Sequence, residues 1–338
     1  MLVVAVSLSL SVQTWLTGEK SNMRLTRRAL IGTAAAGIAS GFASAGHGAT
    51  TGGATMVKTK YKFLQLEGIR LFYREAGPEN APPILLLHGF PSSSRMYAGL
   101  IEMLGDRFRL IAPDYPGFGH SDAPTPAQFN YTFDQIASTM DAFTEALGLK
   151  TYTLFMQDYG VPVGMRMIIK HPERISALII QNGNLYEEGL GPAWEARRAF
   201  WRDRATNEAA LRANFLSLET TRKRHLGTDP DADLYDPDLW TDEFAFLSRP
   251  GQAEIQIELF YDYRHNVELY PTWQAWLRQH QPSTLVIWGR FDASFTEAGG
   301  KAFRKDLPKA NIHMLEAGHF AMDTKLTQVA QLVSDFLQ

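Results

Sequence analysis

Residues 154–160 read LFMQDYG, and this short run carries the most information in the chain. Apolar residues with the character of a buried strand stop at Asp158, and Gly160 opens a helical segment over 163–170. A sharp turn from a strand into a helix presents the side chain at its apex above a parallel sheet. A carboxylate in that place is able to attack saturated carbon and form an ester, which a second step must hydrolyse.

Strands and helices alternate on both sides of this turn. Apolar runs bounded by turn residues predict strands at 61–66, 69–75, 83–87, 109–112, 151–155, 177–181, 284–288 and 312–315. The first two strands form a hairpin that turns at Glu67-Gly68. Apolar residues at helical spacing predict helices at 133–147 and 324–337. This alternation predicts a mostly parallel sheet covered by helices on both faces.

The alternation fails between about residues 184 and 280, where the chain is helical and rich in Trp and Tyr. Because this segment falls between the sixth and seventh strands of the main sheet, we expect a helical lid inserted over the site. The predicted organisation is a leader at 1–55, a core at 56–183 and 281–338, and a lid at 184–280.

The leader has the features of an export signal. Arg27-Arg28 precedes the weakly apolar segment 29–42, and Ala43-Ser44-Ala45 offers a cleavage site between small residues. The pattern resembles a twin-arginine signal that starts at Met23, with residues 1–22 as an annotation artefact. It predicts export, to the periplasm; if the leader itself is an artefact, the protein is cytoplasmic.

Composition excludes several classes of function. The chain has 338 residues, 45% of them hydrophobic and 20% charged, which suits one large α/β domain. The net charge of −3 without a basic stripe disfavours nucleic acid as a partner. The absence of cysteine excludes disulfides, thiolate metal sites and a cysteine nucleophile. No stretch has the roughly 18–20 apolar residues that stable membrane insertion requires.

No metal or organic cofactor is expected. Asp229, Asp231 and Asp233 have the spacing that starts a calcium loop, but Leu234 and Trp240 stand where its glycine and final acid belong. A solvated acidic loop is the better interpretation. The oligomeric state stays open.

Four pieces of sequence place chemical groups at predicted strand ends: HGFP at 88–91, the Asp158 turn, WGRFD at 288–292 and AGHF at 317–320. The backbone N–H groups of Phe90 and Tyr159 are candidate oxyanion donors. Asp158, Asp292 and His319 follow the order nucleophile, acid, histidine, and each comes at the carboxyl end of a strand. The alternatives are Glu297 for the acid and His313 or His88 for the histidine; Asp114 is interpreted as a structural turn residue.

Over about residues 60–338 the chain resembles α/β-hydrolases of the epoxide hydrolase and haloalkane dehalogenase group. The resemblance rests on HGFP at 88–91, DYPGFGHS at 114–121 and DYG at 158–160. It implies the α/β-hydrolase fold, with Asp158 as nucleophile and His319, oriented by Asp292, activating water. The implied substrate is a small apolar molecule, an epoxide or a halogenated hydrocarbon.

The resemblance also bears on the reaction. Dehalogenases of the group usually have tryptophan after the nucleophile and often asparagine at the position of Phe90, whereas this chain has Tyr159 and Phe90. The arginine that fluoroacetate dehalogenases place after the nucleophile to bind a carboxylate is also absent. The sequence therefore favours epoxide hydrolysis.

Lid residues supply the remaining candidates. The run FYDYRHN at 260–266 resembles the family segment that carries an epoxide-polarising tyrosine, and we assign that role to Tyr263, with Tyr261 and Tyr270 as alternatives. We expect Tyr186, Trp201 and Tyr261 to line the substrate pocket, with Tyr186 as a possible second donor. The indole N–H of Trp201 is a candidate hydrogen-bond donor to a leaving halide, so a haloalkane dehalogenase is the alternative hypothesis. A non-catalytic ligand-binding homologue is the third.

Overall fold

The structure is a computed structural model that describes residues 57–338. The predicted leader, with its export signal and the location that it implies, lies outside the described residues.

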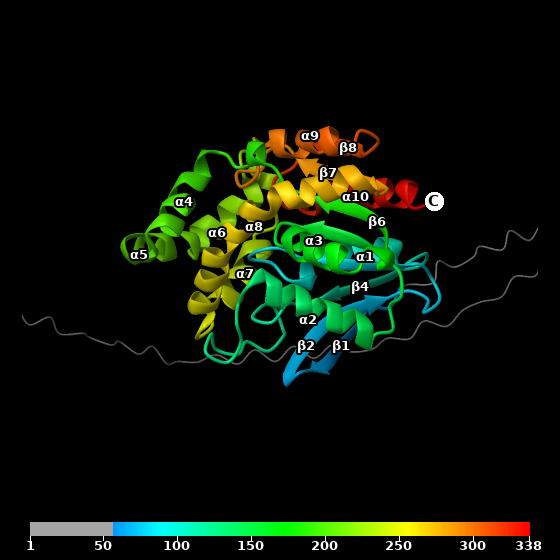
Figure 1. Cartoon of the computed structure of the whole chain (residues 1–338), viewed down its shortest axis with the longest axis horizontal. Coiled ribbons are helices and arrows are strands. Elements are labelled where there is room, and N and C mark those ends of the chain that lie inside the picture. Colours follow the sequence, from blue (N-terminus) through cyan, green and yellow to red (C-terminus); the bar gives the residue numbers. More distant parts are fainter. Residues whose placement is uncertain (1–56) are drawn as a thin grey trace, which may run out of the picture. The chain divides into compact units, whose positions relative to one another are not determined.

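A single eight-stranded sheet forms the centre of the described part (Figure 1). The spatial order is β1 (Lys60–Leu66), β2 (Ile69–Ala76), β4 (Arg109–Pro113), β3 (Pro83–Leu87), β5 (Tyr152–Gln157), β6 (Ile175–Gln181), β7 (Thr284–Gly289) and β8 (Asn311–Leu315). The strands β1, β2 and β4 pair antiparallel, and every later pair is parallel. The predicted fold class is thereby confirmed.

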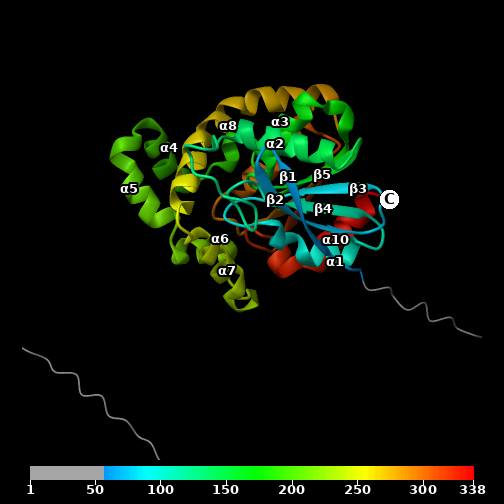
Figure 2. The ribbon, with the colours of Figure 1, turned by 90° about the horizontal axis from the view of Figure 1, so that it is seen from below.

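Helices cover both faces of the sheet. Figure 2 shows α2 (Phe133–Ala146) and α3 (Gly160–Lys170) on one side, and α1 (Ala98–Leu104) and α10 (Met322–Phe336) on the other. The side chains of β3 alternate between these layers, because neighbours along a strand point to opposite faces. Leu85 and Leu87 join the core beneath α2 and α3, whereas Ile84 and Leu86 join the core beneath α1 and α10. The helix α9 (Glu297–Asp306) packs on β7 and β8.

The segment between β6 and β7 is helical, as the sequence predicts. It contains α4 (Glu195–Arg202), α5 (Arg204–Phe215), α6 (Leu218–Leu226), α7 (Asp238–Leu247) and the long α8 (Gln252–His280). In Figure 1 the helices α4 to α7 gather at one end of the sheet. The name lid is kept below for residues 184–280.

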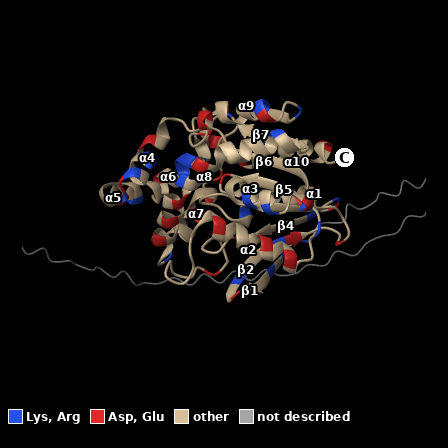
Figure 3. Ribbon diagram, in the orientation of Figure 1, with Lys and Arg blue, Asp and Glu red and all other residues tan. Residues whose placement is uncertain are grey.

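Charged residues of both signs are interspersed along the ribbon, including the lid (Figure 3). Within residues 57–338, no helix combines the length and the apolar character that crossing a membrane would require.

Candidate active site

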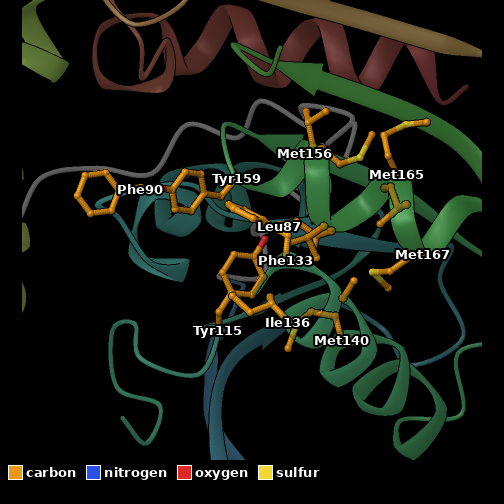
Figure 4. Close-up of a cluster of buried hydrophobic side chains, with 14 of the residues drawn as sticks. Leu87, Phe90, Tyr115, Phe133, Ile136, Met140, Met156, Tyr159, Met165 and Met167 are labelled. Carbon is orange, nitrogen blue, oxygen red and sulfur yellow. The ribbon is translucent and has the colours of Figure 1, made fainter. Parts of the chain in front are cut away.

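Asp158 stands at the apex of the turn between β5 and α3. Its φ of 48° lies in the left-handed region, which non-glycine residues adopt at a cost that functional sites often bear. Two residues later, a Cβ on Gly160 would lie 2.2 Å from the carbonyl oxygen of Leu87, so the turn requires glycine there. Figure 4 shows Leu87, Met156 and Tyr159 in the buried cluster around this turn. A tightly packed strand and a glycine-dependent turn therefore fix the direction of the Asp158 side chain.

A backbone amide holds one oxygen of that carboxylate. The N–H of Phe90, just after β3, donates to Oδ1 of Asp158 at 2.9 Å. Burial raises the pKa of Asp158, while the positive charge of a protonated His319 and the N–H groups of Phe90 and Tyr159 act to lower it. The structure thus places the N–H of Phe90, one of the two predicted oxyanion donors, on the Asp158 carboxylate.

The second oxygen faces a histidine. Nε2 of His319 lies 3.7 Å from Oδ2 of Asp158, and Nδ1 of His319 lies 2.7 Å from Oδ2 of Asp292. The side chain of Gln157 also approaches Nε2, with 2.8 Å between the two nitrogens. With its Nδ1 proton directed to Asp292, the ring presents Nε2 to the space beside Asp158. Burial lowers the pKa of His319, but the charge and hydrogen bond of Asp292 outweigh it, and the net pKa is raised.

Asp292 is itself fixed by neighbouring donors. The side-chain amide of Asn182 donates to Oδ2 at 2.8 Å, and the N–H groups of Ser294 and Phe295 donate to Oδ1 at 2.6 and 3.0 Å. The alternative acid, Glu297, pairs instead with Lys301. The structure therefore brings together Asp158, Asp292 and His319, at the carboxyl ends of three strands.

The alternative histidines have other surroundings. Nε2 of His88 accepts the N–H of Tyr115 at 3.2 Å, and His313 is exposed on β8. Asp114 accepts the N–H groups of Ser94 and His120, at 2.7 and 2.8 Å, as a residue that fixes a turn does. In residues 57–338, no group of three or more His, Asp or Glu side chains is arranged to hold a metal ion.

A nearly closed cavity of about 10 Å³ lies between this site and the lid. Asp158 and His319 lie on its core side. Its lid side is formed by Trp194, Arg197, Phe215, Arg224, Phe260 and Tyr263. The cavity is therefore small, and it is lined by aromatic rings and two guanidinium groups.

Of the lid residues to which the sequence assigned a role at the site, only Tyr263 lines this cavity. Its hydroxyl lies 3.5 Å from that of the alternative candidate Tyr270, and burial raises the pKa of Tyr263 well above its usual value. The group consequently keeps its proton over the ordinary pH range and is able to donate it.

The structure does not place Tyr186, Trp201 or Tyr261 on this cavity. The hydroxyl of Tyr186 donates to Oδ2 of Asp306 at 2.7 Å, beside α9. The indole N–H of Trp201 donates to the carbonyl oxygen of Phe260 at 2.8 Å. Tyr261 lies two positions from Tyr263 on α8, about 200° around the helix, so it faces away from the cavity. It lines a separate surface pocket with Pro126.

Sequence reasoning missed the two cavity arginines. Arg197 belongs to the pair Arg197-Arg198 and Arg224 to the run RKR at 222–224, and both runs look like solvated helix surfaces. The aromatic residues around position 197 were a faint signal, because a guanidinium readily stacks on such rings.

Comparison with known proteins agrees with this architecture. The sequence model of the alpha/beta hydrolase fold family matches residues 82–326. An uncharacterized hydrolase of Saccharomyces cerevisiae is 36% identical over 284 residues, which cover 82% of this chain and 97% of the yeast protein. A haloalkane dehalogenase of Mycolicibacterium paratuberculosis is 38% identical over 137 residues, covering 40% of this chain and 45% of that enzyme.

Among solved structures, the epoxide hydrolase CorEH superposes with a TM-score of 0.67 at 17% identity, over 83% of this chain and 99% of that chain. At that identity the likeness supports the fold alone. The family match and the yeast relative, which is similar over nearly its whole length, identify this chain as a member of the alpha/beta hydrolase fold family.

Proposed function

We propose that this hydrolase opens epoxides to diols through a covalent ester on Asp158. The observation that carries the proposal is the arrangement of the Asp158 carboxylate. Oδ1 accepts the Phe90 N–H, and Oδ2 lies 3.7 Å from Nε2 of His319. One oxygen is thus held for an oxyanion, and the other faces the cavity and the base.

In the first step, Oδ2 of Asp158 attacks one carbon of the epoxide ring. A carbon–oxygen bond forms, a ring carbon–oxygen bond breaks, and its electron pair goes to the ring oxygen. Tyr263 donates its proton to that oxygen. The hydroxyl of Tyr159 is buried without a hydrogen-bond partner in residues 57–338, and the residue lines the same cavity, so we assign it as the second donor.

In the second step, His319 takes a proton from water, and the resulting hydroxide attacks Cγ of the ester. The N–H groups of Phe90 and Tyr159 stabilise the negative charge that develops on Oδ1. The bond between Cγ and the substrate oxygen then breaks, and the diol leaves. The two protons of the water end on the second diol oxygen and on Tyr263, so the cycle returns the enzyme unchanged.

The indole N–H groups near the cavity favour an epoxide over a halide, because both already have acceptors. Trp194 is the one indole that lines the cavity within the described residues, and its N–H donates to the carbonyl oxygen of Ser294 at 2.7 Å. The N–H of Trp201 is similarly occupied by Phe260. Tyrosine hydroxyls suit a developing alkoxide, because they transfer a proton as well as a hydrogen bond. Haloalkane dehalogenation through the same ester remains the second candidate.

The experiment is to trap the ester. His319→Gln removes the base for the second step, so incubation with styrene oxide should yield a protein heavier by one substrate, with the added mass on Asp158. His313→Gln, at an exposed position of β8, is the matched control and should turn over without accumulating the adduct. In parallel, wild-type protein is assayed with styrene oxide and with 1-bromobutane.

Each result has a distinct meaning. Diol formation and an adduct on Asp158 support the proposal. Bromide release without diol formation would assign the dehalogenase reaction instead. Binding of these compounds without any adduct or turnover would contradict the covalent mechanism and favour a non-catalytic ligand-binding protein.

A further inference from the structure

Two guanidinium groups lie opposite the Asp158 carboxylate. Arg197 on α4 and Arg224 on α6 both line the cavity, and both come from the lid. The ring of Phe215 lies between them, with its centroid 5.4 Å from the Arg197 guanidinium and 4.3 Å from that of Arg224. Arg197 also lies 4.1 Å from the centroid of Trp194, and Arg224 lies 4.6 Å from that of Phe90. Aromatic rings therefore hold both cations in defined positions.

Among the described residues, neither cation has an anionic partner of its own. No carboxylate of residues 57–338 forms an ion pair with Arg197 or Arg224. Arg224 is only 5% exposed, one of its terminal nitrogens donates to the carbonyl oxygen of Phe215 at 3.0 Å, and the other, Nη1, is buried without a partner in the described residues. Cation–π contacts offset only part of the cost of removing a cation from water. Because Nη1 of Arg224 is a buried donor at the cavity, we expect the ligand to supply the acceptor for its hydrogen bond.

The charges agree with that interpretation. Burial and the neighbouring positive charge of Arg197 lower the pKa of Arg224 to about 9, so it is still cationic at neutral pH. Burial also lowers the pKa of Arg197, and the nearby Tyr159 and Asp158 act against this. Two cations thus face one reactive carboxylate, so one further negative charge would balance the charge of the cavity. A planar carboxylate matches the fork of a guanidinium.

We propose that Arg197 and Arg224 bind a carboxylate on the substrate, so that the preferred substrates are short epoxy acids rather than apolar epoxides. The identity of the reactive group rests on the function proposed above, whereas the recognition of a carboxylate rests on the two arginines. The lid arginines bind the anionic end and leave the epoxide ring between Asp158 and Tyr263. This substrate class replaces the apolar one that the sequence suggested.

The first test measures binding without chemistry. Propionate is titrated into the protein by calorimetry in a buffer free of other small carboxylates, with propionamide as the neutral isostere. Wild-type protein should bind propionate in preference to propionamide. Arg224→Met and Arg197→Met should each weaken propionate binding by about ten- to hundredfold, the loss expected for a charge-assisted hydrogen bond.

Control variants separate charge from folding. Arg198→Met on α4 and Arg222→Met on α6 remove arginines outside the cavity and should leave propionate binding unchanged. Arg224→Lys keeps the charge and should bind propionate more tightly than Arg224→Met, even if both variants are less stable. Asp158→Asn removes the like charge across the cavity and should tighten binding.

The second test measures preference in turnover, with glycidate against glycidamide. Wild-type protein should show the higher kcat/KM for glycidate, and the ratio of the two values should fall at least tenfold in Arg224→Met. If wild-type protein binds propionate no better than propionamide, or if both Met variants bind it like wild type, the inference is overturned. If propionate binding depends on the arginines but no epoxide is turned over, carboxylate recognition stands and the proposed reaction fails.

Discussion

A buried ionic cluster connects the lid to the loop that carries His319. His225, the last but one residue of α6, has Nδ1 2.8 Å from Oδ2 of Asp323 and Nε2 2.9 Å from Oε2 of Glu243. Its ring stacks on Phe320, with the centroids 4.5 Å apart. Burial lowers the pKa of His225, but the two carboxylates outweigh it and raise the pKa to about 10. A single protonated histidine therefore joins α6, α7 and the start of α10.

We predict that His225→Phe, which keeps a ring against Phe320, strongly destabilises the fold. The substitution leaves the carboxylates of Glu243 and Asp323 buried without their cation. Removing one member of a buried ionic group typically costs about 3–5 kcal/mol. At about 2–4 °C per kcal/mol for a domain of this size, the melting temperature should fall by roughly 6–20 °C at pH 6.5.

The pH dependence gives an independent check on the cause. Because folding raises the pKa of His225, its contribution is complete below about pH 6.5, the ordinary value for histidine, and is lost as the pH rises towards about 10. The difference in melting temperature between wild type and His225→Phe should therefore shrink over that interval. Thermal melts followed by circular dichroism measure it, with His265→Phe, at the exposed pair with Glu268, as control. A difference below about 2 °C, or one that stays constant from pH 6.5 to 10, would refute the reasoning.

Three further predictions concern the reaction. Asp292→Asn withdraws the negative partner of His319, so ester hydrolysis should slow and the ester should accumulate in stopped-flow or mass measurements; unchanged turnover would contradict the role of Asp292. Tyr263→Phe should slow formation of the ester by roughly 10²–10⁴-fold, the usual contribution of a general acid, whereas Tyr261→Phe should have little effect. Because His319 must be neutral to act as a base and its pKa is raised, the rate of ester hydrolysis should increase with pH through a midpoint above 6.5; a midpoint below that value would count against this assignment.

The core was predictable because its signals are local. The predicted bounds of β3, 83–87, match the structure, and the other strands differ from prediction by one or two residues at their ends. Burial on both faces of a parallel sheet produces continuous apolar runs that a sequence displays directly. The strand β5 extends to Gln157 rather than ending at Phe155, because Met156 and Gln157 still pair with β6.

The lid side of the cavity was not predictable, because its helices are aromatic on several faces. Tyr261 and Tyr263 are nearly indistinguishable in sequence, and only the rotation of α8 against the core decides which of them reaches the cavity. Arg224 was missed for a related reason: one helical run contains an exposed Lys223 and a buried Arg224. Tertiary packing sets that difference, and helix propensity says nothing about it.

The most direct test of the covalent mechanism follows the oxygen of water through one turnover. Excess wild-type protein is mixed with whichever of styrene oxide and glycidate it hydrolyses faster, in water enriched in oxygen-18, and both the diol and the peptide that contains Asp158 are analysed by mass spectrometry. Attack of water on the ester carbonyl predicts that the label enters the Asp158 carboxylate and that the first diol is unlabelled. Label in the diol with none in Asp158 would mean that water attacks the epoxide itself, and would contradict the proposed role of this carboxylate.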